Sequence, residues 1–373
     1  MIRLILLIFF FLLSLLAVFK APAYYIWLTA IVVTEYPLIL VAITALITLS
    51  GIWIAPYRLT GNIIGIVTIV IYLSPVVRAY WVSKDVNEDM KRAFANASLP
   101  VNKSPFSFLS LFKATHPVAF KTVTYAQYPG VSLTMDYYGN TFSAKQPCVI
   151  MVHGGSWSSG DSQQLPDLNW YLAGKGYQVA SINYRMAPKY QTPAPVEDIE
   201  NAIKYLSAHA VELNIDTTKF VLLGRSAGAQ IALLAAYTLQ NPHIKGVIDF
   251  YGPADMVWGY SIPSNPLIMD SRKVMRNYIG GTYEVVPQKF KACSPLEFVN
   301  RQSVPTLIIH GENDVLVSRE HSRRLDLRLE EYGIPHYWLK LPWATHGFDF
   351  NLNGPGGQLS TYAVETFLYT VTQ

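Results

Sequence analysis

From about Val118 onward, short apolar runs alternate with stretches of helical periodicity, and this alternation constrains the fold more than any other feature of the chain. The runs are rich in β-branched residues and nearly continuous in apolar character, as parallel strands buried on both faces are. They read CVIMV, QVASIN, FVLLG, GVIDFY, TLIIH and YWLKL. The helical stretches are Leu165–Lys175, Pro195–Ala210, Ala227–Leu239, Ser318–Tyr332 and Ser360–Val371. The pattern predicts one α/β domain over residues 118–373, with a doubly wound, mostly parallel sheet.

Two segments depart from this regular alternation. The runs KTVTYA and SLTMDYY flank Pro129-Gly130, which predicts a β-hairpin ahead of the parallel strands. The segment Asp255–Gly281 follows a strand, is rich in aromatic residues and has no clear period. We expect it to be an insertion over the edge of the sheet where open α/β sheets bind ligands.

The first 83 residues have a different composition. The chain is 51% hydrophobic and 14% charged, and its N-terminal part contains only five charged side chains: Arg3, Lys20, Glu35, Arg58 and Arg78. Beyond Ser83 there are 25 basic and 24 acidic residues, so the net charge of +4 comes mostly from the apolar region. No basic face is present, and the composition therefore argues against nucleic-acid binding.

The apolar region predicts a multi-pass integral membrane protein. We expect three spans, at Arg3–Phe19, between Pro22 and Ile54, and at Leu59–Val77. Apolar residues continue past Lys20, which argues against a cleaved signal peptide. The second stretch contains Pro37, so a kinked helix or an extra crossing stays open. The predicted organisation is an all-α transmembrane region (1–83), a juxtamembrane linker (84–117) and an α/β domain (118–373).

Two signals disagree about which side of the membrane the α/β domain occupies. Basic residues after the last predicted span favour the cytoplasmic side, namely Arg78, Lys84, Lys91 and Arg92. Glycosylation sequons at Asn96 and Asn102 favour the opposite side. We give the charge rule slightly more weight. Glu35, an acid within the apolar region, is expected near a membrane interface or at a helix break.

Ser226 lies in the motif Gly224-Arg225-Ser226-Ala227-Gly228, between the FVLL run and a helical stretch. A strand–turn–helix of this kind holds a serine on a sharp turn at the carboxyl edge of a sheet. A Cβ atom at either flanking glycine would collide with backbone in so tight a bend. The motif predicts a nucleophile, which needs a base and a site that stabilises an oxyanion.

An acid and a histidine follow Ser226 in the order that this type of site requires. Asp314 comes just after the run TLIIH, and His346 comes just after YWLKL. His346 would accept the serine proton, and Asp314 would hold the imidazole in the required tautomer. Glu312 and Asp349 are rival acids. Other histidines are expected to be solvated at the surface, namely His116, His209, His243, His321 and His336.

A glycine loop after CVIMV supplies candidate anion-binding amides. It reads His153-Gly154-Gly155-Ser156-Trp157. The amides of Gly154 and Gly155, with that of Ala227, would form the oxyanion hole. We expect His153 to buttress this loop by hydrogen bonding.

Together these motifs, with YRMAP, PAPVED, HGENDVLV and HGF, resemble the α/β-hydrolase superfamily. The resemblance is to its hormone-sensitive-lipase-like carboxylesterases with an HGG-x-W loop, including feruloyl-esterase-like and prenylcysteine-methylesterase-like enzymes. It implies ester hydrolysis by Ser226, Asp314 and His346 through an acyl-enzyme, without metal or cofactor. The chain departs from the family pattern where it has HGGS in place of HGGG, which affects which amides form the hole.

The expected substrate is a small-molecule ester. Trp157, Tyr251 and Trp258 are candidates for the lining of an apolar substrate pocket, and the membrane region brings membrane lipid and lipid-derived esters within reach. An amidase, an arylformamidase or an acyltransferase would use the same residues. A non-catalytic membrane binding protein with a hydrolase fold is the alternative from another class.

Overall fold

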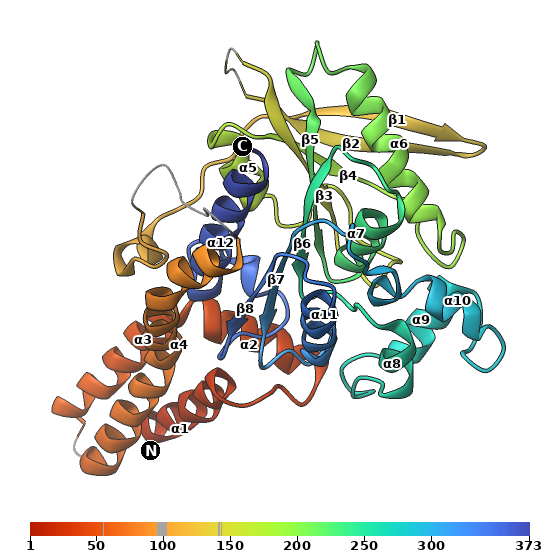
Figure 1. The fold of residues 1–373 in the computed structure, drawn as a ribbon. Coiled ribbons are helices and arrows are strands. Elements are labelled where there is room, and N and C mark those ends of the chain that lie inside the picture. The colour runs from red at the N-terminus through yellow and green to blue at the C-terminus, as the bar shows by residue number, and fades with distance from the viewer. Residues whose placement is uncertain (55, 95–102, 141, 143) are drawn as a thin grey trace.

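The computed structural model describes residues 1–54, 56–94, 103–140, 142 and 144–373, and a twisted sheet lies at its centre (Figure 1). The strand order is β1-β2-β4-β3-β5-β6-β7-β8. The strands are β1 (Lys121–Tyr128), β2 (Val131–Tyr138), β3 (Gln146–Val152), β4 (Gln178–Ile182), β5 (Ile215–Arg225), β6 (Ile244–Phe250), β7 (Thr306–Gly311) and β8 (His336–Leu341). Strands β3 to β8 are parallel, and β1 and β2 add an antiparallel hairpin at one edge. The predicted fold class is confirmed.

The strand order reverses direction between β3 and β5. Strand β4 lies on one side of β3 in the sheet. The later strands β5, β6, β7 and β8 follow one another on the other side of β3. The loops that follow β3 and β5 therefore separate at this point and leave a crevice at the carboxyl edge. The glycine loop follows β3 and Ser226 follows β5, so the topology puts both predicted motifs at the crevice.

Helices cover both faces of the sheet, which explains why its strands are apolar throughout. One face packs against α6 (Ala194–Ala208), α7 (Ala227–Thr238) and α11 (Glu320–Glu331). The other face packs against α5 (Asp167–Gly174), α12 (Pro355–Val371) and the second half of α4 (Arg58–Ala93). Along β3, Ile150 contacts the first set and Val149 and Met151 the second. The predicted helices thus agree with the observed ones to within a few residues.

The segment between β6 and β7 forms a helical layer beside the carboxyl edge of the sheet. It contains α8 (Met256–Ser261), α9 (Ser271–Ile279), α10 (Pro287–Ala292) and the 3-10 turn η4 (Pro295–Phe298). The side chain of Asp255 caps α8 by accepting the N–H of Trp258, and Asp270 caps α9 in the same way. The insertion is therefore built from short, individually capped helices.

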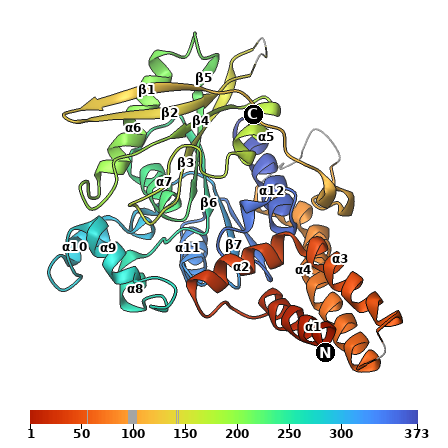
Figure 2. The ribbon, with the colours of Figure 1, turned by 180° about the vertical axis from the view of Figure 1, so that it is seen from behind.

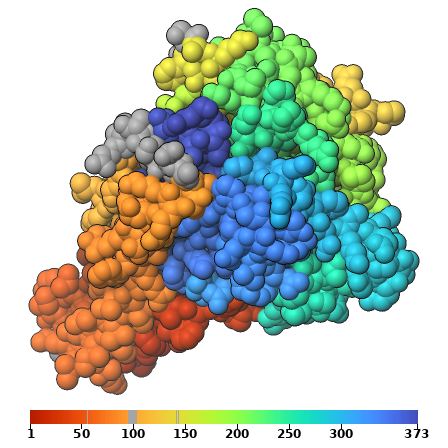
Figure 3. Space-filling model, viewed as in Figure 1, coloured from red at the N-terminus to blue at the C-terminus, as the bar shows by residue number. Residues whose placement is uncertain are grey.

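The N-terminal region is a group of helices, of which α1, α3 and the first half of α4 project from the α/β domain while α2 lies against it (Figures 2 and 3). They are α1 (Ile2–Ser14) with its 3-10 turn η1 (Leu15–Ala17), α2 (Tyr24–Glu35), α3 (Pro37–Leu49) with η2 (Ser50–Ile52), and the first half of α4. Helix α3 runs alongside α4, because Thr48 lies against Gly65 near one end of the pair and Leu40 clusters with Tyr72 near the other.

The prediction of three full spans is not supported. Among the described residues one helix, α4, is long and apolar enough to cross a membrane. The second predicted span is broken into α2 and α3, which reach the necessary length only together and are bent by 86° at their junction. Residues Ile2–Ala17 form a shorter apolar helix.

Helix α4 continues through the predicted junction at residues 83 and 84. Val86, Met90 and Phe94 are buried against α12 and the sheet, so this part of the chain is built into the α/β domain. A short 3-10 helix, η3 (Phe108–Phe112), precedes β1. The sequon residues Asn96 and Asn102 lie outside the described residues.

Glu35 is buried at the end of α2 and contacts the α/β domain. Its carboxylate accepts the N–H of Gly356 at 2.9 Å, in the first turn of α12. Asn351 donates to the Glu35 carbonyl oxygen at 2.8 Å. A carboxylate at the start of a helix satisfies free N–H groups and complements the helix dipole. Of the two predicted positions for Glu35, a membrane interface or a helix break, the structure shows the helix break. Its carboxylate caps α12, which is distant in the sequence.

Candidate active site

Ser226 occupies a strained turn between β5 and α7. Its φ is +53°, a left-handed conformation that costs a non-glycine residue about 1–3 kcal/mol. A Cβ atom at Gly224 would lie 2.2 Å from the carbonyl oxygen of Gly228. One at Gly228 would lie 2.2 Å from the carbonyl oxygen of Val152. Only glycine fits at either position, and the backbone can therefore bend tightly enough to present the Ser226 side chain at the crevice.

His346 and Asp314 come from the loops after β8 and β7 and contact each other directly. The distance between His346 Nδ1 and Asp314 Oδ2 is 2.7 Å. The other carboxylate oxygen of Asp314 accepts the N–H groups of Leu316 and Val317 at 2.8 and 2.9 Å. Burial alone would raise the pKa of Asp314, but His346 and His310 hold it well below its ordinary value. Asp314 therefore stays ionised beside the imidazole.

His310 is a second histidine partner of Asp314, and the sequence analysis did not single it out. His310 Nε2 lies 3.1 Å from Asp314 Oδ2, and the ring is anchored by Ser322 Oγ at 2.7 Å. The residue ends the run TLIIH inside β7, where it looks like part of an apolar strand. Its position directly before the Gly-X-X-Asp segment that ends at Asp314 is the only signal that the sequence offers.

The ring of His346 is enclosed by aromatic side chains from two separate parts of the chain. The ring of Tyr251, after β6, lies 4.3 Å from it. Trp27 on α2 lies edge-on at 6.2 Å and donates its indole N–H to the His346 carbonyl oxygen at 3.0 Å. His346 and Ser226 line the same cavity of about 560 Å³. The structure thus brings the three predicted residues to one edge of the sheet.

The rival acids have other partners. Glu312 pairs at the surface with Arg319 at 3.0 Å. Asp349 is buried in an ion pair with Arg225 at 2.5 Å and accepts the Tyr251 hydroxyl at 2.6 Å. In the described part of the chain, neither carboxylate is a hydrogen-bond partner of the imidazole.

The glycine loop after β3 carries two of the three predicted amides, those of Gly154 and Gly155, and the two differ in availability. The N–H of Gly154 already donates to Gln164 Oε1 at 2.7 Å. Gly155 has a φ of +114°, and a Cβ there would lie 2.0 Å from the Ser159 carbonyl oxygen, so glycine is required. Gln164 and Gly155 both line the cavity that contains Ser226. No motif in the sequence pointed to Gln164.

His153 fixes the start of this loop, as the sequence analysis expected. It is buried, its Nδ1 lies 2.7 Å from the Gly154 carbonyl oxygen, and its ring stacks on Tyr184 at 4.3 Å. Burial lowers the pKa of His153, so the ring is held neutral. A neutral ring must donate from Nδ1 to make this contact, which leaves Nε2 without a proton.

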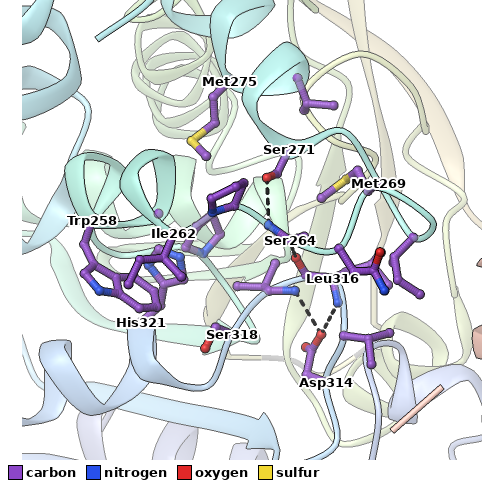
Figure 4. A pocket seen from close by; sticks show the side chains of 18 of the residues that line it. Trp258, Ile262, Ser264, Met269, Ser271, Met275, Asp314, Leu316, Ser318 and His321 are labelled. Carbon is purple, nitrogen blue, oxygen red and sulfur yellow. Dashed lines mark hydrogen bonds between the residues drawn. The ribbon is translucent and has the colours of Figure 1, made fainter. Parts of the chain in front are cut away.

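The three aromatic candidates for substrate contact lie in the walls of two adjacent cavities. Tyr251 lines the cavity of Ser226. Trp157 and Trp258 line a neighbouring cavity of about 340 Å³ beside Asp314 (Figure 4). Trp157 also stacks on Tyr278 at 4.6 Å, so it packs the domain as well as facing the cavity.

One prediction about the other histidines is wrong. His321 was expected to be solvated, but it is buried beside the second cavity. Its ring meets Trp258 edge-on at 4.9 Å, and Nδ1 accepts the N–H of Asp255 at 3.2 Å. Burial lowers its pKa to about 3. The local sequence is polar because α11 is amphipathic, and His321 lies on its buried side.

The parallel sheet with a strained serine turn after β5 and an acid and a histidine after β7 and β8 defines an α/β-hydrolase. Solved structures with this fold include the metagenomic carboxylesterase EstE1, which has a TM-score of 0.59 at 20% identity over 79% of this chain and 98% of EstE1. An acetyl ester-xyloside bifunctional hydrolase from Caldicellulosiruptor lactoaceticus has a TM-score of 0.58 at 19% identity, over 67% of this chain and 96% of that one.

Within this class, the chain belongs to the BD-FAE family, which residues 135–329 match. It is similar to the esterase LipC of Mycobacterium tuberculosis (strain ATCC 25618 / H37Rv), with 30% identity over 60% of this chain and 58% of LipC. It is also similar to the esterase LipQ of the same organism, with 28% identity over 55% of this chain and 51% of LipQ. The matches thus span little more than half the length of these relatives.

Proposed function

We propose that this chain is a membrane-anchored serine hydrolase that cleaves carboxylic esters through an acyl-enzyme. The observation that carries the proposal is the 2.7 Å contact between His346 and Asp314 on the cavity that Ser226 also lines. The esterase relatives support the reaction class. The substrate is a small-molecule ester, and the reaction needs no group beyond this chain and water.

In the proposed mechanism Ser226 Oγ attacks the ester carbonyl carbon while His346 Nε2 takes the hydroxyl proton. The tetrahedral intermediate collapses, the bond to the alcohol oxygen breaks, and His346 returns the proton to the leaving alcohol. Water then attacks the acyl-enzyme with the same base, which releases the carboxylic acid and restores the serine. Asp314 holds His346 Nδ1–H toward itself and stabilises the imidazolium, which the low pKa of Asp314 supports.

The amides of Gly155 and Ala227 are the donors that we propose for the oxyanion. Gly155 is supported by its place on the cavity wall and by a backbone conformation that needs glycine. Ala227 follows the nucleophile and begins α7, where N–H groups are free of intrahelical partners. Gly154 joins them only when Gln164 releases its N–H.

Helix α4 is the proposed membrane anchor. It is the described helix whose length and composition suit a membrane span, and α1 and α3 pack along its apolar first half. An alkaline carbonate wash of membranes tests this proposal. We expect the protein to stay in the pellet, and release into the supernatant would contradict an integral anchor.

The enzymatic proposal is tested by the hydrolysis of a panel of p-nitrophenyl esters and matched p-nitroanilides in detergent. We expect ester turnover that Ser226→Ala reduces by about 10⁴-fold or more. A folded wild-type protein that hydrolyses no ester would contradict the proposal. Preferential cleavage of the anilides would identify an amidase instead.

A further inference from the structure

Helix α2 is the part of the apolar N-terminal region that contacts the candidate active site. It lies against the carboxyl edge of the sheet, on the side where β7 and β8 end (Figures 1 and 2). Trp27 and Ile31 are buried against Val315 and Leu316, and Trp27 bonds to the main chain of His346. This part of the chain lies outside residues 135–329, which match the family. The N-terminal region therefore forms part of the site itself.

The angle between α2 and α3 fixes how α2 would lie at a membrane. Helix α3 runs alongside α4, the candidate span, and α2 is bent from α3 by 86°. If α4 crosses a bilayer, α3 follows its direction and α2 lies nearly parallel to the membrane plane. A helix in this orientation lies in the interface between lipid and water.

The outer face of α2 is apolar and exposed. Tyr25, Leu28 and Val32 are spaced as one helical stripe and are 80%, 40% and 46% exposed. Exposed apolar residues continue onto α1, α3 and the first half of α4, for example Phe9, Leu46 and Val70. Soluble monomers rarely expose apolar surface this extensively, and tyrosine favours the lipid–water interface. Because this surface is continuous with the candidate span, the partner that covers it is the bilayer.

The cavity of Ser226 opens on this same side. Tyr24 and Leu28 on α2 line the cavity and are also exposed, at 43% and 40%, and so is Phe350 after His346, at 54%. These three side chains form an apolar rim. Deeper in, the walls include Ile31 and Met269, which are also apolar. A hydrocarbon chain could therefore pass from lipid to Ser226 along an apolar surface.

We infer that α2 lies in the membrane interface as one wall of the cavity, and that the substrate is a lipid ester that enters directly from the bilayer past Tyr24, Leu28 and Phe350. This inference rests on the proposed esterase function and names its substrate class. The acyl carbon–oxygen bond breaks at Ser226, and water supplies the hydroxyl of the released fatty acid. A cavity of about 560 Å³ is within the usual size of a site for a single small ligand, so it admits part of a lipid.

The position of α2 is tested with an environment-sensitive fluorophore on Tyr25→Cys in the full chain, reconstituted in liposomes that contain brominated lipid. Both natural cysteines are buried, so the new thiol is the one that reacts. We expect a blue-shifted emission that brominated lipid quenches. The control is Val211→Cys, which is 85% exposed and lies just after α6, in the α/β domain and outside the N-terminal helices. A Tyr25 probe as water-exposed as the Val211 probe would overturn the inference.

The entry route is tested with Leu28→Glu, which places a charge on the cavity rim. We measure turnover on a long-chain ester in liposomes and turnover on p-nitrophenyl acetate, and take the ratio of the first to the second. This ratio should fall at least about tenfold, because the hydrocarbon chain of the substrate must pass a charge. The matched control is Thr29→Glu, which adds the same charge to α2 at a half-buried residue outside the cavity lining and should leave the ratio within about twofold.

An unchanged ratio in Leu28→Glu, or an equal fall in Thr29→Glu, would overturn entry past α2. These outcomes are distinct from failure of the proposed function. If the function is wrong, the wild-type protein hydrolyses neither ester, and no ratio can be measured.

Discussion

Single buried residues determine how the site is held. One carboxylate oxygen of Asp314 accepts hydrogen bonds from two backbone N–H groups, and the other contacts two histidines. The orientation of the carboxylate is therefore fixed before any substrate binds. A rigid, ionised carboxylate selects the imidazole tautomer that has a proton on Nδ1. This tautomer leaves His346 Nε2 without a proton, as the proposed role of a base toward Ser226 requires.

Replacing Asp314 by Asn is expected to lower kcat by about 10⁴-fold, because an amide can favour the wrong tautomer of His346. Folding should persist, since Asn retains an oxygen that accepts the N–H groups of Leu316 and Val317. Steady-state kinetics with circular dichroism checks both parts. Glu312→Gln, the rival acid at the surface, is the control and should stay within about twofold. A folded Asp314→Asn enzyme within tenfold of wild type would refute the role.

Asp249, at the end of β6, makes stability depend on pH. Burial raises its pKa from 3.8 to about 7, although His310 and the N–H of Gly252 act in the opposite direction. Between about pH 4 and pH 7 the folded protein keeps a proton that the unfolded chain has lost. The free energy of unfolding therefore falls as pH rises through this window.

The substitution Asp249→Asn tests this dependence. The asparagine side chain does not titrate, and its oxygen can still accept the Gly252 N–H, whose nitrogen lies 2.6 Å from Asp249 Oδ1. We expect Asp249→Asn to gain roughly 1–3 kcal/mol over wild type at about pH 8 and to lose most of this advantage at about pH 4. Denaturant unfolding in detergent at the two pH values measures the difference. An advantage that is constant with pH would show that Asp249 does not carry the proton.

At the scale of elements, the sheet and its edge loops were predictable because each signal is local. The run FVLL followed by Gly-Arg-Ser-Ala-Gly specifies both β5 and the turn that holds Ser226. Asp314 and His346 each follow an apolar run directly, and the carboxyl ends of parallel strands meet at one edge. The same reasoning missed His310 and Gln164, because their roles depend on partners that are distant in space and absent from any local pattern.

The turn at Ser226 depends on the absence of side chains at its flanks. Gly228→Ala places a methyl group 2.2 Å from the Val152 carbonyl oxygen, so the backbone must shift. We expect a loss of about 2–3 kcal/mol in the free energy of unfolding, together with loss of activity. Gly174→Ala is the control, because its added Cβ meets nothing within 4 Å. It lies in the last turn of α5 and should be neutral or stabilising by up to about 1 kcal/mol.

If Gly228→Ala unfolds at the same denaturant concentration as wild type and hydrolyses esters normally, the turn does not need the glycine. The account of the nucleophile's geometry would then be wrong. Refolding yield is measured alongside, so that a variant that fails to fold is still compared with Gly174→Ala.

At the scale of the whole molecule, the N-terminal region could not be placed from its sequence. Hydropathy gives the same signal for a side chain that faces lipid and for one that packs against protein. Trp27 and Ile31 are buried against the α/β domain, whereas Tyr25 and Val32 are exposed, yet all four lie on α2. The second predicted span, for which a kink at Pro37 was left open, is a pair of helices at 86°, and the contact of α2 with the candidate site was not predicted.

Trp27 links the N-terminal region to the carboxyl edge of the sheet, where the candidate site lies. Trp27→Phe keeps an aromatic ring but removes the N–H that bonds to the His346 carbonyl oxygen. The lost hydrogen bond is worth about 1 kcal/mol, and a barrier raised by this amount lowers a rate roughly fivefold. We therefore expect kcat on a water-soluble ester to fall roughly fivefold. Trp53→Phe is the control, because Trp53 is 80% exposed in the turn between α3 and α4. Equal kcat values in the two variants would mean that α2 does not support His346.

The central claim is that Ser226 is an activated nucleophile, and covalent labelling tests it most directly. The full chain in detergent is treated with a fluorophosphonate, and the modified residue is located by peptide mass spectrometry. We predict one label per chain, on Ser226, with no labelling of Ser226→Ala and slow labelling of His346→Ala. A folded wild-type protein that takes up no label, or a Ser226→Ala variant that still does, would contradict the account.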